Sequence, residues 1–208
     1  MKPPYKLKDG SIVPGVSTIS NLYPDEGKQD RLMNWAVKLA KQGKDWRKEL
    51  KYAGEIGTLA HAMIMSDLKG EITDTGGYSS EQIHLALMCL DKFTDWQYKH
   101  QIEPILMEHP LVSEKHRFGG QLDLYVKVIS TGKMRLISIK TTGGIYESHW
   151  VQEGGYEITL AENGHRVDEC QILWLPKDNR FDDPIRTDLR REKRIFKYLL
   201  AVYKLRNL

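Results

Sequence analysis

Apolar side chains recur every three or four positions in five stretches of the chain, which is the pattern of helices that bury one face. The stretches cover residues 32–40, about 46–68, 79–97, 149–161 and 189–203. The third opens with Ser79 and, three residues later, Gln82, which is the form of a capping box. The fourth ends at Asn163-Gly164, and Thr187-Asp188 precedes the fifth as a candidate cap. Five helices are therefore predicted.

The pattern changes at Pro104, after which short apolar runs alternate with turn residues. Residues 105–112, 120–129 and 134–139 are predicted strands, and residues 170–175 are a fourth. Gly119-Gly120 and residues 130–133 are predicted turns, so the second and third strands should form a hairpin. The opening residues 10–24, which contain Pro14, Gly15 and Pro24, predict extended or turn structure.

This order of elements predicts an α/β (α+β) fold in which helices flank one central mixed β-sheet. A chain of 208 residues suits a single domain over residues 1–208. Within it we expect an N-terminal helical part over residues 1–103, then the sheet core and the C-terminal helix over residues 104–208.

Composition narrows the class of protein. Apolar residues make up 40% of the chain, and no apolar run approaches the roughly 20 residues of a membrane-spanning helix. The first residues lack the apolar stretch of a signal peptide. Cys89 and Cys170 lie far apart and cannot supply the four thiolates of an iron–sulfur cluster. We therefore expect a cytoplasmic protein with no membrane association and no iron–sulfur cluster.

The net charge of +3 does not by itself indicate a nucleic-acid partner. Residues 186–206 contain eight Lys and Arg but only two acids, Asp188 and Glu192. This segment is either the solvated face of an amphipathic helix or a surface that follows phosphates.

Four short segments carry candidate chemistry. Gly57-Thr58-Leu59-Ala60-His61 presents one imidazole from a helix, although a single histidine also fits a purely structural role. Asp123 lies between two leucines of a predicted strand, where a carboxylate is costly unless a cation meets it; a strand-end residue facing water is the alternative. Ser138 and Lys140 are two positions apart, so they share one face of a strand. Lys140 suits a position beside a phosphate, or it extends to solvent.

The fourth segment, Gln152-Glu153-Gly154-Gly155-Tyr156, places an amide and a phenol one helical turn apart. Such a pair can hold a nucleotide strand by hydrogen bonding and stacking, although tyrosine is also an ordinary residue between a helix and a sheet.

Taken in order, these segments resemble the PD-(D/E)XK nuclease superfamily, and within it the RecB-like branch of phage-type exonucleases that includes the mitochondrial genome maintenance exonuclease. That branch has a helix with G-x-x-x-H, a strand with G-x-[ILV]-D, a strand with [DE]-x-K and a helix with Q-x-x-x-Y. The matching segments here are Gly57 to His61, Gly120 to Asp123, Ser138 to Lys140, and Gln152 to Tyr156. The resemblance covers about residues 12–175 and implies a restriction-endonuclease-like core.

The resemblance also implies an activity: a metal-dependent DNA exonuclease that hydrolyses phosphodiester bonds of single-stranded DNA or DNA ends, in recombination or repair. Recombination proteins are candidate partners. It implies Mg²⁺ or Mn²⁺ bound by His61, Asp123 and the main-chain carbonyl of Ile139, with Asp123, position 138 and Lys140 as the catalytic set. Gln152, Tyr156 and Glu108 are the implied DNA contacts. Alternatively, Glu108 is only a charged residue on an edge strand.

The chain departs from the family pattern at Ser138, where the motif has Asp or Glu. A serine hydroxyl is neutral and binds hard cations poorly. Three explanations are open: an inactivating substitution, a carboxylate that has migrated to Glu147 or Glu153, and a catalytically silent module that only binds nucleic acid. The first is favoured because the rest of the motif is intact.

Overall fold

The computed structural model describes residues 4–25 and 27–207. The helices are α1 (Val16–Ser20), α2 (Lys28–Lys41), α3 (Trp46–Lys69), α4 (Ser80–His100), α5 (Glu147–Glu162) and α6 (Arg190–Arg206). The strands are β1 (Tyr5–Lys6), β2 (Ile12–Val13), β3 (Ile102–Met107), β4 (Pro110–Ser113), β5 (Phe118–Gln121), β6 (Leu124–Val128), β7 (Met134–Lys140), β8 (Glu169–Trp174) and β9 (Ile185–Arg186). Within this part of the chain no helix is long and apolar enough to cross a membrane.

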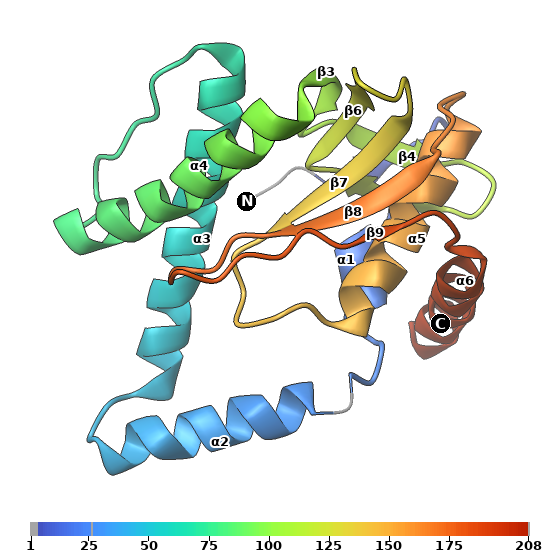
Figure 1. Cartoon of the computed structure of the whole chain (residues 1–208). Helices are drawn as coiled ribbons and strands as arrows, with labels where there is room; N and C mark the ends of the chain where they lie inside the picture. Colours follow the sequence, from blue (N-terminus) through green and yellow to red (C-terminus); the bar gives the residue numbers. More distant parts are fainter. Residues whose placement is uncertain (1–3, 26, 208) are drawn as a thin grey trace.

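The central feature is a five-stranded mixed sheet in the order β3-β6-β7-β8-β9, with helices on both faces (Figure 1). One buried apolar cluster lies between this sheet and the pair α3 and α4. A second lies on the other face, beneath α1, α5 and α6. The predicted fold class, a mixed sheet flanked by helices, is confirmed.

Local signals located most of the elements correctly. Ser79 caps α4, and its side chain and that of Gln82 complete the predicted capping box. The hairpin of β6 and β7 is antiparallel, as predicted. Strand β8 then pairs in parallel with β7 after the crossover through α5. Because β7 and β8 are parallel, their carboxyl ends meet at one edge of the sheet.

Two predicted strands are each divided in two. Residues 105–112 contain the end of β3 and most of β4, which belong to different sheets. The chain bends between them at Glu108, whose φ of 45° lies in the left-handed region. The predicted strand over residues 120–129 is likewise interrupted at Leu122 and Asp123, which lie between β5 and β6. The apolar residues on either side of each break belong to one continuous stretch of sequence, and their pattern does not show which sheet each half joins.

The predicted turn at Gly119-Gly120 is wrong, since both glycines lie within β5. A Cβ at Gly119 would lie 2.7 Å from the side chain of Tyr5, and one at Gly120 would lie 2.6 Å from the ring of Tyr156. These glycines therefore permit close approach of aromatic rings rather than a turn. Residues 10–24 were expected to be extended, but Val16–Ser20 form α1, which packs on α5 and α6. Strand β9 was not predicted.

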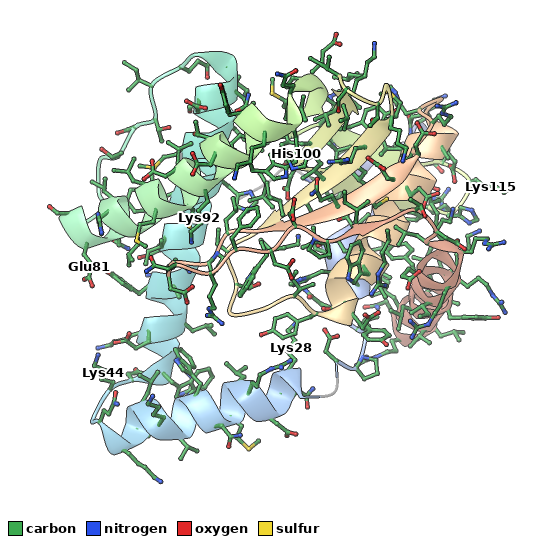
Figure 2. The ribbon with its side chains drawn as sticks, in the orientation of Figure 1. Lys28, Lys44, Glu81, Lys92, His100 and Lys115 are labelled. Carbon is green, nitrogen blue, oxygen red and sulfur yellow. The ribbon has the colours of Figure 1, made fainter. Side chains whose placement is uncertain are left out.

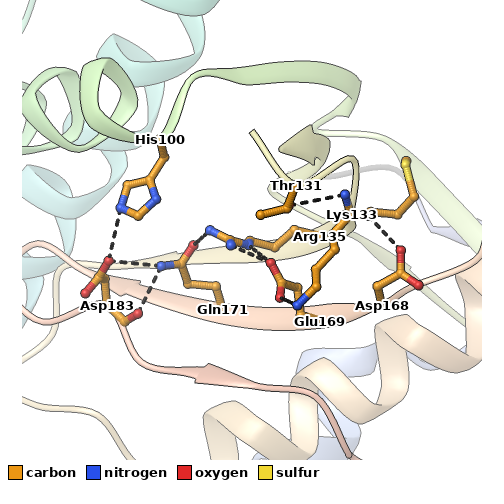
Figure 3. Close-up of polar contacts among 9 residues, drawn as sticks. His100, Thr131, Lys133, Arg135, Asp168, Glu169, Gln171 and Asp183 are labelled. Carbon is orange, nitrogen blue, oxygen red and sulfur yellow. Dashed lines mark hydrogen bonds and ion pairs between the residues drawn. The ribbon is translucent and has the colours of Figure 1, made fainter. Parts of the chain in front are cut away.

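A polar network lies on the sheet at the end opposite the carboxyl ends of β7 and β8 (Figure 3). The guanidinium of Arg135 on β7 donates to Glu169 and Gln171 on β8, and Lys133 also pairs with Glu169. Asp183, before β9, accepts from Gln171 and lies 3.6 Å from His100 at the end of α4. The network joins α4 to β7, β8 and the segment that leads to β9.

Candidate active site

A cleft of about 1110 Å³ lies between α2, α3 and the edge of the sheet where β7 ends. Five residues singled out from the sequence line it: His61, Glu108, Asp123, Ile139 and Lys140. They come from α3, from the bend after β3, from the bend before β6 and from the end of β7. The tertiary structure therefore brings together residues that are up to 79 positions apart.

Asp123 is held in place from two sides. Its Oδ2 accepts a hydrogen bond of 2.9 Å from the main-chain N–H of Ile139. Its Oδ1 lies 3.9 Å from Nδ1 of His61. The carboxylate is thus oriented by β7 while its other oxygen remains available near the imidazole. The expected metal-binding role of the Ile139 carbonyl stays a prediction.

Gly57 explains how the helix motif reaches the sheet. A Cβ at this position would lie 2.7 Å from Oγ1 of Thr141, the residue that follows β7. Glycine therefore lets the end of β7 approach α3 closely. One helical turn later, the same face of α3 presents His61 to the cleft.

Lys140 is the first member of a hydrogen-bonded chain. Its ammonium donates to Oε1 of Gln152 on α5 over 2.8 Å. Nε2 of Gln152 lies 3.5 Å from the hydroxyl of Tyr156, and that hydroxyl donates to the carbonyl of Gln121 over 2.9 Å. The chain fixes the amide of Gln152 with its oxygen toward Lys140, so α5 orients the lysine.

Tyr156 is buried, and burial, with the charges of Asp123 and Glu153, raises the pKa of its phenol well above the ordinary value. The hydroxyl therefore stays protonated and remains a donor. In this structure the ring packs beside Gly120 and Val16 rather than projecting into the cleft. The expected DNA-binding role of Gln152 and Tyr156 stays a prediction.

Ser138 faces α5, not the open cleft, and is 1% exposed. Its hydroxyl forms a short hydrogen bond to Oε1 of Glu153. Glu153 is completely buried, and no hydrogen-bond partner for its Oε2 is found among the described residues. The position that the family motif assigns to an acid is therefore in contact with an acid that another element supplies.

Burial raises the pKa of Glu153 to about 8, which the charge of Lys140 and the Ser138 hydrogen bond oppose. The charge of Asp123 raises it further. An acid that is buried with one unsatisfied oxygen, between a lysine and a second carboxylate, is typical of a functional site.

Glu147, the other acid considered from the sequence, is engaged elsewhere. Its carboxylate pairs with Arg186 at 2.8 Å and lies 3.7 Å from Arg191. It is 42% exposed. Because Glu147 pairs with cations beside α6, the geometry favours Glu153 over Glu147 as a neighbour of position 138.

The donor atoms match a hard divalent cation in kind. Mg²⁺ and Mn²⁺ prefer carboxylate oxygen; Asp123 lines the cleft, whereas Glu153, with its unsatisfied Oε2, is completely buried and is not among the residues that line it. Over residues 4–25 and 27–207, no three His, Cys, Asp or Glu side chains lie together as a preformed metal-binding group.

The bend at Glu108 was not visible in the sequence. Its N–H donates to the carbonyl of Asp123 over 2.9 Å, so the residue is tied to the bend that carries the central acid. A positive φ in a residue other than glycine is a strained conformation that concentrates at functional sites. The side chain lines the cleft on the side of the sheet edge.

Four of the eight basic residues in residues 186–206 pair with acids: Arg186, Arg190, Arg191 and Lys193. Arg186 contacts Glu192, Lys193 contacts Glu157, and Arg190 contacts Asp188. The cations that line the cleft come instead from other elements, and sequence reasoning missed four of them: Lys28, Arg31, Lys69 and Lys177. Only the position of Lys177, soon after an apolar strand, resembled that of Lys140 closely enough to have signalled it.

Comparison with known proteins adds a limited fold likeness. No family model and no curated protein matches the chain. Among solved structures, SSO0001 is 15% identical over 74% of this chain and 70% of its own, with a TM-score of 0.37. LHK-Exo in complex with dAMP is 15% identical over 74% of this chain and 86% of its own, with a TM-score of 0.38. A phage-related exonuclease from Haemophilus somnus 129PT is 13% identical over 96% and 94%, with a TM-score of 0.40.

Proposed function

We propose that this chain is a metal-dependent nuclease that hydrolyses phosphodiester bonds of DNA, taking single strands or DNA ends, and that Glu153 supplies its second acid. The observation that carries the proposal is the contact between Ser138 and Glu153. Serine at position 138 is short enough to leave space for a carboxylate from α5. The pair therefore keeps an acid beside position 138, although the strand itself lacks one.

The charges at the site are suited to a divalent cation and a phosphate. The charge of Asp123 raises the pKa of Glu153, and the charge of Lys140 lowers it. Two acids near each other repel unless a cation joins them. Asp123, Glu153, the Ile139 carbonyl and His61 would hold Mg²⁺ or Mn²⁺, which when bound polarises a phosphate and lowers the pKa of a coordinated water.

The protein's own groups have distinct roles in this proposal. The N–H of Ile139 orients Asp123, and the hydroxyl of Ser138 orients Glu153. Lys140, held by Gln152, orients the attacking water and offsets the negative charge that develops on the phosphate. This arrangement predicts activity from the form with serine at position 138, so it departs from the inactivated form favoured on sequence alone.

The test is a cleavage assay of the full chain on single-stranded, linear double-stranded and circular DNA, with Mg²⁺ or Mn²⁺ and with a chelator. We expect metal-dependent cleavage that requires a free end. Glu153→Gln should lower the rate at least ~100-fold. Glu157→Gln, one turn along the same helix and paired with Lys193, is the matched control and should retain the rate.

Other outcomes identify the alternatives. Activity that survives Glu153→Gln and disappears in Glu147→Gln would assign the second acid to Glu147. An inactive natural chain that becomes active as Ser138→Asp would overturn the role of Glu153. DNA binding with no cleavage by either form would instead indicate a silent binding module.

A double variant tests directly whether the acid can be supplied by β7 instead of α5. Ser138→Asp with Glu153→Ser returns the acid to β7 and places the hydroxyl on α5. If the acid's place near Asp123 is what matters, the double variant should recover part of the activity that Glu153→Ser loses. If no activity is recovered and circular dichroism shows that the double variant is folded, an acid at position 138 cannot replace Glu153 and the proposal is contradicted.

A further inference from the structure

Lys177 is a second lysine at the sheet edge that carries Lys140. It follows β8 by three residues and lines the cleft. Strands β7 and β8 run in parallel with Lys140 paired to Trp174, so Lys140 ends β7 and Lys177 lies just beyond the carboxyl end of the adjacent strand. Ligands of open α/β sheets bind in the crevice at that edge. Nζ of Lys177 lies 3.4 Å from the carbonyl of Thr141, the residue after Lys140.

The ammonium of Lys177 has no acidic partner in the described part of the chain. Burial lowers the pKa of this ammonium, and among the described residues only an ionised Cys89 would oppose that effect. Cys89 is itself a buried thiol with a raised pKa, so it remains neutral. A partly buried ammonium is costly without a counter-charge, and an anion entering the cleft would supply one.

The backbone around Lys177 is fixed from two sides. The ammonium of Lys92 on α4, labelled in Figure 2, donates to the carbonyls of Pro176 and Asp178, the two residues that flank Lys177. On the other side, the indole N–H of Trp174 donates to the carbonyl of Thr142 over 2.7 Å. The segment is therefore held before any ligand arrives, which lowers the entropy cost of binding.

We propose that Lys177 binds an internal phosphate of the nucleic-acid strand, next to the phosphate that Lys140 addresses. The inference rests on the proposed function for the identity of the ligand. Nζ of Lys177 lies 3.4 Å from the carbonyl of Thr141, the residue after Lys140, so the two lysines suit neighbouring phosphates of one backbone. Lys140 acts on the reacting phosphate, whereas Lys177 holds the strand, and Lys92 is a positioning residue for Lys177.

The test measures binding of a single-stranded oligonucleotide to the full chain in a chelator, at several salt concentrations. Loss of one phosphate contact lowers the slope of log Kd against log salt by about 0.7 for a single strand. We expect Lys177→Ala to show this change and about a five-fold weaker Kd, and Lys177→Arg to retain the slope. Lys99→Ala, at an exposed lysine on α4, is the control and should change neither quantity.

Lys92→Met tests the positioning role. It should weaken oligonucleotide binding, and the double variant with Lys177→Ala should be no weaker than Lys177→Ala alone, because both changes remove the same contact. Additive losses would overturn the positioning role. Melting temperatures of all variants separate this effect from unfolding.

Two results would overturn the inference. One is an unchanged salt slope in Lys177→Ala. The other is an equal loss of affinity for a mononucleotide, which would assign Lys177 to a terminal or product phosphate. If Lys177→Ala lowers the salt slope while the unsubstituted chain cleaves no DNA, the proposed function fails and the phosphate contact stands. If cleavage is normal in Lys177→Ala and the slope is unchanged, only the inference fails.

Discussion

The hydroxyl of Ser138 on β7 is hydrogen-bonded to the carboxyl group of Glu153 on α5, and both side chains are buried. The bond links the strand that carries Lys140 to the helix that carries Gln152. It also leaves Oε2 of Glu153 without a partner in the described structure. The consequence is that strand and helix jointly position the acid.

Removal of the Ser138 hydroxyl should weaken metal-dependent cleavage more than it lowers the free energy of unfolding. In Ser138→Ala, Glu153 loses the group that orients it, and loss of such a supporting hydrogen bond typically costs ~10–100-fold in metal affinity or activity. We expect the Mn²⁺ concentration for half-maximal cleavage to rise by about ten-fold. Ser130→Ala, at an exposed turn, is the control. Equal metal dependence in both variants would contradict an orienting role.

Two glycines of α3 should respond oppositely to alanine. In Gly57→Ala the new Cβ meets Oγ1 of Thr141 at 2.7 Å, so the end of β7 must move away from the helix. Overpacking of this kind costs ~1–3 kcal/mol. Nothing lies within 4 Å of a Cβ at Gly54, so Gly54→Ala should stabilise the helix by ~0.5–1 kcal/mol. Urea denaturation checks both values, and a destabilised Gly54→Ala beside a neutral Gly57→Ala would refute the packing argument.

The hydroxyl of Tyr156 should matter for turnover, because it belongs to the chain that orients Lys140. Tyr156→Phe should lose ~1–2 kcal/mol of stability and slow cleavage, with little change in DNA affinity. Tyr125→Phe is a matched control: that buried phenol donates to the carbonyl of Arg166, away from the cleft. The control should lose similar stability and keep its rate. A larger loss of DNA affinity than of turnover in Tyr156→Phe would instead support direct strand contact.

His149 should make the fold sensitive to acid. Burial, with the charges of Lys140 and Lys28, lowers the pKa of its imidazole to about 3, while Nδ1 accepts the N–H of Tyr146. Between pH 6.5 and 3 the unfolded chain therefore binds a proton that the folded chain does not. The free energy of unfolding should fall by up to ~1.4 kcal/mol for each pH unit below 6.

His149→Gln should remove this contribution and flatten the pH dependence of the urea midpoint between pH 6 and 4. His84→Gln is the control, because that histidine lies on α4, far from α5 in the fold. An unchanged pH dependence in His149→Gln would show that other groups account for any loss of stability in acid.

Local sequence patterns predicted most of the helices and strands because their signals lie within a few residues. The capping box of Ser79 and Gln82 and the apolar stripe of α4 are both local. The errors arose where the outcome depends on distant residues. Gly119 and Gly120 looked like a turn, but both pair with β4, and the absence of a Cβ makes room for the rings of Tyr5 and Tyr156.

The sequence by itself predicted that His61, Asp123 and Lys140 belong to one site, because the order of their motifs resembles that of a nuclease family. Tertiary structure alone decided which acid accompanies Ser138, and that Lys177 lies beside Lys140. Both depend on how α5 crosses the sheet and on the parallel pairing of β7 and β8. The physical reason is that burial and hydrogen bonding between distant segments fix these contacts, and no spacing along the chain encodes them.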